Sequence, residues 1–542
     1  MRATINNPIL PGFNPDPSIC RVGDDYYIAT STFEWYPGVQ IHHSTDLVNW
    51  RLVSRPLNRP DLLDMRGNPD SCGVWAPCLT YSEGVFYLVY TDVKRHSGDA
   101  KDAHNYITRC TTIDGDWQAP VYINSSGFDP SLFHDDDGRR WFLNMLWDYR
   151  PDKPSFGGIV LQELDRDNLS PVGPVHTIFA GSDLGMVEGP HLYKRNGYYY
   201  LLTAEGGTEY DHACTLARSR QLTGPYELHP KQHLITARFD PQCPLQRAGH
   251  GDLVETPEGE TYLVHLCSRP LANRGRSPLG RETAIQKLTW GDDDWLWPDA
   301  DCLSPQIQVP GPETRNHTST PAREADIDYR FTARQLPVDF QWLRTPFPET
   351  LFSLSERPGY LRLYGRESLG SLFNSSLVAR RQQSQRFTAS TTLDFQPRHF
   401  QQMAGLVCYY NSRKYHYLFI SHDETLGRCL DVMSCLADAN GHGHYPLNGH
   451  RIPLPAQGPV RLRAEVDFEH LYFSWASQGE NWQRLPLKLD YSVLSDEAGT
   501  GAGNNFTGAF VGMAAQDLSG TGTPADFSGF EYREGAGLGG FP

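Results

Sequence analysis

One pattern recurs five times in the chain, as GDDYYIATST (residues 23–32), EGVFYLVYTD (83–92), DGRRWFLNMLWD (137–148), NGYYYLLTAEGG (196–207) and EGETYLVHLCSR (258–269). Each copy has a turn, aromatic residues and then an apolar strand, and the anchoring aromatics are Tyr27, Tyr87, Phe142, Tyr200 and Tyr262. Their spacing of roughly 55–62 residues suits one propeller blade with long loops. Because repeated β-meanders hide their edges by radial closure, we predict a five-bladed β-propeller over residues 1–315. An irregular β-sandwich is the alternative.

The residue composition and the strand pattern change after Val309. The stretch that starts at Pro310 is rich in turn-forming residues, and we place a linker at 316–325. Strands with a period of two and short turns follow, such as YLRLYGRES and LYFSWAS. This alternation predicts an antiparallel β-sandwich domain over residues 326–542, so the fold class is all-β.

Composition narrows the function. The chain has 542 residues and a formal net charge of −16. It lacks the basic stripe of a nucleic-acid binder, and its acidic surface disfavours anionic membranes, so we expect a soluble protein with a neutral substrate. The aromatic share of 12% fits sugar binding, because pyranose faces stack on rings, but it fits any all-β protein equally well.

The cysteines and the N-terminus indicate a compartment. The eleven cysteines form no CxxC pair, and the first residues, MRATINNPIL, contain no apolar signal region. We therefore expect reduced thiols and a cytoplasmic location, with no membrane partner.

A distinctive residue stands about 11–13 positions before each anchoring aromatic. These residues are Asp16 in FNPDPS, Trp75 in VWAPC, Asp129 in FDPSLF, Glu188 in VEGPH and His250 in AGHGD. The innermost strand of each blade lines the central channel of a propeller, so we expect these five positions to be equivalent and to face one another at the axis.

Three of these five residues have carboxyl side chains, the groups that glycoside hydrolysis uses. Two carboxyl groups on opposite sides of a glycosidic oxygen can cleave the bond if one of them stays protonated. Burial and a like-charged neighbour both raise a pKa, and crowding Asp16, Asp129 and Glu188 in one channel supplies both. Asp-Pro dipeptides also simply begin turns, so for any single acid the structural explanation remains open.

FNPDPS, FDPSLF, VEGPH and PLGRETAIQK resemble glycoside hydrolase family 43, and the likeness covers nearly the whole chain. It is strongest to two-domain β-D-xylosidases with α-L-arabinofuranosidase side activity, whose second domain is concanavalin-like. The resemblance implies an inverting, exo-acting enzyme in which Asp16 is the general base, Glu188 the general acid and Asp129 the residue that raises the pKa of the acid. An inverting pair leaves room for a water, so carboxyl groups roughly 6.5–9.5 Å apart are expected.

The resemblance also implies substrate-binding residues. Arg281 would contact substrate hydroxyls, and Phe506 would be inserted over the pocket by the second domain. Aromatic pocket walls would come from Phe33, Trp75 and Trp147, although each of these residues could be plain core. His250 would form hydrogen bonds without a metal, and it is the candidate ligand if a calcium ion is present. We expect no cofactor, a small oligosaccharide as the substrate, and a homo-oligomer like related xylosidases.

Three alternatives stay open. Fructan-cleaving hydrolases share a propeller and a sandwich but use a retaining mechanism and a WMNDPNG-like motif, where this chain has FNPDPS. A non-catalytic sugar-binding propeller is a second alternative. Within the family, the main activity could be that of an α-L-arabinofuranosidase, because the two pentoses are similar in size.

Overall fold

In the computed structural model of the chain, residues 2–272, 274–299, 302–313, 321–437, 441–499 and 505–535 are described. The chain divides into two compact units. Unit 1 comprises 1–63, 72–274 and 281–323, and unit 2 comprises 64–71, 275–280 and 324–542. Residues 316–320 of the predicted linker lie outside the described part, and 321–325 have no regular structure.

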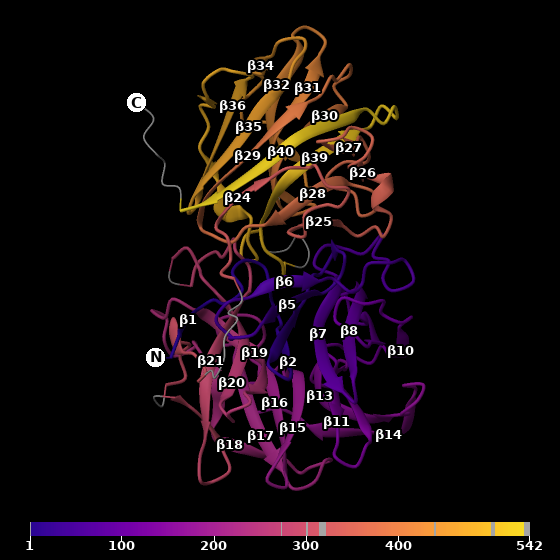
Figure 1. The fold of residues 1–542 in the computed structure, drawn as a ribbon, viewed down its shortest axis with the longest axis vertical. Coiled ribbons are helices and arrows are strands. Elements are labelled where there is room, and N and C mark those ends of the chain that lie inside the picture. Colours follow the sequence, from indigo (N-terminus) through magenta and orange to yellow (C-terminus); the bar gives the residue numbers. More distant parts are fainter. Residues whose placement is uncertain are drawn as a thin grey trace. The chain divides into compact units, whose positions relative to one another are not determined.

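Unit 1 contains five four-stranded antiparallel sheets, one for each repeat (Figure 1). In blade order their strands are β2 (Ser18–Val22), β3 (Asp25–Thr30), β5 (Gln40–Ser44) and β6 (Arg51–Ser54); β7 (Gly73–Ser82), β8 (Val85–Arg95), β9 (Asp102–Cys110) and β10 (Val121–Asn124); β11 (Ser131–His134), β12 (Arg140–Trp147), β13 (Phe156–Leu164) and β14 (Pro171–Phe179); β15 (Glu188–Arg195), β16 (Tyr198–Glu205), β17 (Ala213–Ser219) and β18 (Glu227–Thr236); β19 (Gln246–Glu255), β20 (Thr261–Ser268), β21 (Glu282–Trp290) and β22 (Leu296–Pro298). The predicted five-bladed propeller is confirmed.

Every anchoring aromatic lies on the second strand of its blade, in the hairpin partner of the first strand. Four of the five are buried, and Tyr27 is half-buried against His43 and Phe86. The recurring aromatics thus fill the layers between blades, which explains why the pattern returns once per blade.

The two ends of unit 1 are joined by a short antiparallel pair. Strand β1 (Thr4–Asn6) pairs with β23 (Gln308–Pro310). Nearby, the backbones of Leu10 and Thr283 form an isolated bridge, which ties the start of the chain to blade 5. The short strand β4 (Trp35–Tyr36) follows β3 in the first repeat.

Unit 2 consists of two large antiparallel sheets around one core. The first has the order β26 (Phe352–Ser353), β27 (Leu361–Tyr364), β40 (Pro524–Glu534), β29 (Arg386–Asp394), β35 (Val460–Asp467), β36 (His470–Ser477) and β37 (Gln483–Arg484), with β24 (Asp326–Tyr329) on β40 and β38 (Leu489–Asp490) on β36. The second includes β33 (Gly443–His444), β32 (Gly427–Leu436), β31 (Lys414–Asp423), β30 (Gln402–Asn411), β39 (Phe510–Asp517), β28 (Ser376–Arg381) and β25 (Phe340–Leu343), with β34 (Ile452–Pro453) on β32.

Alternation along the strands explains this core. Strand β29 alternates between exposed or half-buried and buried residues, so Phe387, Ala389 and Leu393 point inward. The helices of the described residues are two 3₁₀ turns, η2 (Pro348–Thr350) and η3 (Tyr491–Val493). None of the described helices is long and apolar enough to span a bilayer.

Candidate active site

Each blade presents one residue with a left-handed backbone at, or one position after, the predicted axial residue. These residues are Asp16 (φ 54°), Ala76 (35°), Asp129 (56°), Gly189 (55°) and His250 (45°). Each precedes a proline or a glycine in the sequence. Register shifts in the first hairpins of blades 2, 4 and 5 fall at these positions, as bulges beside active sites commonly do.

This ring corrects two of the predicted equivalences. Trp75 and Glu188 stand one residue before the equivalent positions, which are held by Ala76 and Gly189. Glycine is favoured at 189, because an added Cβ would lie 3.0 Å from the His250 ring, a tight contact. The equivalent position in each blade is therefore the left-handed residue directly before a proline or a glycine, whatever its side chain.

Asp16 is held in the ionised form. Its Oδ1 accepts a hydrogen bond from Arg281 Nη1 at 2.6 Å, and its Oδ2 accepts one from Ser31 Oγ at 2.6 Å. The Ser31 hydroxyl in turn accepts the Ala76 N–H at 2.7 Å. Burial alone would raise the pKa of Asp16, but Arg281, His250 and the Ser31 hydrogen bond together lower it below its usual value.

Asp129 and Glu188 behave in the opposite way. Burial, followed by the charge of Asp16, raises the pKa of Asp129 to about 8, although Arg281 and the Gly189 N–H oppose this rise. Burial and then the charges of Asp129 and Asp16 raise the pKa of Glu188 well above its ordinary value. The two carboxyl groups titrate as a pair, and the pair retains a proton at neutral pH.

The Asp129 carboxylate is linked directly to the chain segment that carries Glu188. Its Oδ2 accepts the Gly189 N–H at 3.1 Å. The Glu188 carboxyl itself has no hydrogen bond or ion pair with any residue in the described ranges. A protonated Glu188 can therefore donate its proton to a bound molecule without first breaking an internal bond.

His250 lies between two of the acids. Its Nδ1 is 3.8 Å from Asp16 Oδ1 and 3.8 Å from Asp129 Oδ2. Burial lowers the pKa of His250 to about 4 despite the charge of Asp16, so the imidazole is neutral at pH 7. It contributes a polar but uncharged wall to the site.

These donors do not suit a calcium ion. Calcium takes six to eight oxygen ligands, whereas both oxygens of Asp16 are already engaged by Arg281 and Ser31. Within the described residues, no group of three or more His, Cys, Asp or Glu side chains is arranged to hold a metal ion. We derive no chemical step through a metal.

The predicted aromatics form a continuous wall. Phe33 and Trp75 have ring centroids 5.6 Å apart, and Arg281 lies over Phe33 at 5.4 Å. Trp147 joins them through Phe128, whose ring is 5.4 Å from Trp75 and 6.3 Å from Trp147. The sequence prediction missed Phe128, although its place directly before Asp129 in FDPSLF could have signalled it.

Two further residues that the prediction missed support the acids. Ser31 bridges Asp16 and Ala76, as described above. Glu205, in the quoted run TAEGG, is fully buried and accepts the Ser182 N–H at 2.7 Å and the Thr215 hydroxyl at 3.0 Å. Because the backbone of Ala204 pairs with Glu188, these bonds fix the turn that leads into Glu188.

Phe506 belongs to unit 2, where it is half-buried and its N–H donates to Ser71 Oγ at 3.0 Å. Its expected role as a cover of the pocket stays a prediction.

His212 supports the backbone beside His250, and this contact predicts the effect of a small substitution. An alanine Cβ at Gly249 would lie 2.0 Å from His212 Cδ2, and both groups are buried. We expect Gly249→Ala to lower the free energy of unfolding by about 1–3 kcal/mol, because an overpacked core must shift. Chemical denaturation measures this loss. Gly259→Ala is the control, because a Cβ added at this glycine would meet open space, although its φ of 82° also disfavours alanine. A smaller loss of unfolding free energy for Gly249→Ala than for Gly259→Ala would contradict the packing argument.

Comparison with known proteins agrees with this geometry. Residues 5–296 match the model of glycosyl hydrolases family 43, and residues 328–533 match the beta xylosidase C-terminal concanavalin A-like domain. The chain is 54% identical to xylosidase/arabinosidase 43B of Humicola insolens, over 98% of this chain and 97% of that protein. It is 50% identical to the beta-xylosidase of Bacillus subtilis (strain 168), over 98% and 99% of the two chains.

Among solved structures, xylan beta-1,4-xylosidase from Bacillus halodurans C-125 superposes with a TM-score of 0.94 at 51% identity, covering 98% of this chain and 100% of that one. Both parts of the chain and nearly its full length are therefore matched, and the chain is a glycosidase that belongs to glycosyl hydrolases family 43.

Proposed function

We propose that the protein is an exo-acting, inverting glycosidase that releases terminal D-xylose from the non-reducing end of short β-1,4-xylo-oligosaccharides and also hydrolyses α-L-arabinofuranosides. One observation carries the mechanism: an ionised Asp16 lies in the same buried site as the proton-retaining pair Asp129 and Glu188. The printed names of the similar proteins support the choice of sugars.

The proposed reaction is a single displacement. Asp16 removes a proton from water, whose oxygen attacks the anomeric carbon as the bond to the leaving oxygen breaks. Glu188 delivers its proton to that oxygen, and Asp129 keeps the pKa of Glu188 high through its charge. Arg281 keeps Asp16 ionised and presents its guanidinium beside the Phe33 ring.

The stereochemistry of the first product tests this proposal. Proton NMR during early hydrolysis of 4-nitrophenyl β-D-xylopyranoside should show α-xylose before mutarotation. β-Xylose as the first product would support the retaining alternative, and no turnover would support a sugar-binding propeller. Comparing kcat/KM on 4-nitrophenyl β-D-xylopyranoside with kcat/KM on 4-nitrophenyl α-L-arabinofuranoside determines which pentose is preferred. A higher value for the arabinoside would favour the arabinofuranosidase alternative.

The pKa shifts predict a broad, bell-shaped pH profile of kcat/KM. Asp16 must be deprotonated, so activity is lost as pH falls through its lowered pKa, which lies below the ordinary 3.8. The acid pair must hold a proton, so activity is lost as pH rises through the raised pKa of the pair, about 8 for Asp129. We expect a plateau between these limits. An alkaline limb below pH 6 would contradict the raised pKa of the pair.

Replacing Asp129 tests the origin of the alkaline limb. Asn is close in size to Asp and can still accept the Gly189 N–H, but it removes one negative charge beside Glu188. We therefore expect Asp129→Asn to move the alkaline limb of kcat/KM to lower pH by about one unit or more. An unmoved limb would show that the charge of Asp129 does not set the pKa of the acid.

We also propose that the enzyme works in the cytoplasm, on oligosaccharides that have already been imported. All eleven cysteines are free thiols, which suits a reducing compartment. Fractionation of the source cells, followed by xylosidase assays of each fraction, tests this location.

A further inference from the structure

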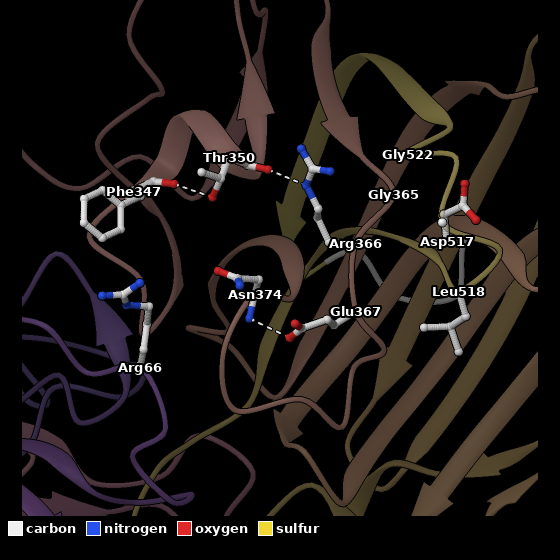
Figure 2. Close-up of a pocket in the computed structure, with 11 residues that line it drawn as sticks. Arg66, Phe347, Thr350, Gly365, Arg366, Glu367, Asn374, Asp517, Leu518 and Gly522 are labelled. Atoms are coloured by element: carbon white, nitrogen blue, oxygen red, sulfur yellow. Dashed lines mark hydrogen bonds between the residues drawn. The ribbon is translucent and has the colours of Figure 1, made fainter.

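A groove of about 550 Å³ opens in unit 2, within the β-sandwich domain (Figure 2). Its walls come from segments that are far apart in the sequence, and all of its lining residues belong to unit 2. Among these lining residues are Arg66, Phe347, Arg366, Asn374, Asp517 and Leu518. A volume of this size is within the range of small-ligand sites.

Two polar side chains in the groove have unused hydrogen-bonding groups. Arg366 is oriented by its Nε, which donates to the Thr350 carbonyl at 2.6 Å. Its two Nη groups form no hydrogen bond or ion pair with any residue in the described ranges, and the same is true of the Asn374 side-chain amide. A fixed guanidinium fork and a nearby amide supply both donors and an acceptor to a ligand.

The opposite wall is rigid. Asp517 Oδ2 accepts the Thr521 hydroxyl at 2.7 Å and the Thr523 N–H at 2.9 Å, and Oδ1 accepts the Ser519 N–H at 2.9 Å. The loop after β39 is thus held in one shape, so a ligand would not have to order it. Preformed walls lower the entropic cost of binding.

Charge in the groove favours a neutral ligand. Two arginines, Arg66 and Arg366, and two carboxylates, Glu367 and Asp517, line the groove, so the formal charges of its lining cancel. The Phe347 ring and the half-exposed Leu518 add apolar surface. A mixture of donors, acceptors and apolar faces without excess charge matches a sugar, which presents hydroxyls at its edge and C–H groups on its faces.

We propose that this groove is a non-catalytic binding site for a neutral oligosaccharide. The choice of a xylo-oligosaccharide rests on the proposed function. Such a site would hold substrate on unit 2 without taking part in bond cleavage. The fork of Arg366 and the amide of Asn374 would bind hydroxyls, and Phe347 and Leu518 would contact the sugar faces.

Methyl NMR can observe the site directly, because Leu518 carries its methyl groups into the groove. The experiment titrates xylotriose into the full-length Glu188→Gln protein, in which hydrolysis is suppressed. We expect the Leu518 methyl signals to shift and saturate at millimolar ligand. The signals of Leu426, which is 42% exposed elsewhere in unit 2, should stay constant.

Variants then test the chemistry of the groove. Arg366→Ala and Asn374→Ala, each added to Glu188→Gln, should weaken the Leu518 response about fivefold, which is the effect of losing one hydrogen bond. Arg334→Ala is the matched control, since Arg334 is an exposed arginine of unit 2 that does not line the groove. Unchanged thermal midpoints would show that the variants remain folded.

Three results would overturn the proposal: no Leu518 shift with xylotriose, equal shifts in the parent and both groove variants, or a shift with inorganic phosphate alone. Hydrolysis of 4-nitrophenyl β-D-xylopyranoside by the Arg366→Ala protein with Glu188 intact should equal that of the unaltered enzyme. That assay also separates the two hypotheses, because it tests the proposed function without involving the groove.

Discussion

Replacing Glu188 by glutamine should lower kcat/KM on xylobiose by about 10²- to 10⁴-fold, the usual contribution of a general acid. Glutamine keeps the size of the side chain but has no proton to give to a departing sugar hydroxyl. The loss should be far smaller on 2,4-dinitrophenyl β-D-xylopyranoside, whose leaving group departs without protonation. Steady-state kinetics on both substrates measure the difference.

Glu205 provides a matched control for this experiment. It is a second buried glutamate in the same blade, on the strand that pairs with β15, and its carboxylate is occupied by Ser182 and Thr215. Glu205→Gln disturbs the support of the site but removes no proton donor, so its losses on the two substrates should be equal. Equal losses for Glu188→Gln as well would show that Glu188 is not the acid.

The sequence predicted the propeller because the information for each blade is local. A hairpin turn and a buried aromatic on the second strand recur in every blade, so counting the copies counts the blades. The three acids were found for the same reason, since each stands about 11–13 positions before that aromatic. The one-residue error at Trp75 and Glu188 arose because equivalent positions in the blades share a backbone conformation, and the type of side chain does not reveal that conformation.

The supporting contacts could not be predicted in this way. Ser31, directly after the second strand of blade 1, contacts both Asp16 and Ala76, which lies on the first strand of blade 2. Arg281 reaches Asp16 from 265 residues away in the chain. Residues 64–71 and 275–280 group with unit 2 although they interrupt the propeller sequence. Such partners are chosen by tertiary packing, which leaves no periodic signal along the chain.

Replacing Asp16 by asparagine should lower kcat/KM on 4-nitrophenyl β-D-xylopyranoside by about 10²- to 10⁴-fold. Asparagine can still accept the hydrogen bonds from Arg281 and Ser31, but it cannot take a proton from water. Sodium azide needs no deprotonation, so it should restore turnover in this variant and give α-D-xylosyl azide, the product of attack opposite the leaving group.

Asp129→Asn is the control for the azide experiment, because the proposed role of Asp129 is to raise the pKa of Glu188 and not to activate water. Azide should leave the rate of that variant unchanged. Rescue of Asp129→Asn instead of Asp16→Asn would exchange the roles of the two aspartates.

A retaining enzyme without its nucleophile would also form the α-azide, so the rescue must be interpreted together with the first anomer that the unaltered enzyme releases. α-Xylose from that enzyme and α-azide from Asp16→Asn together require Asp16 to be the base of a single displacement, because a retaining enzyme releases β-xylose.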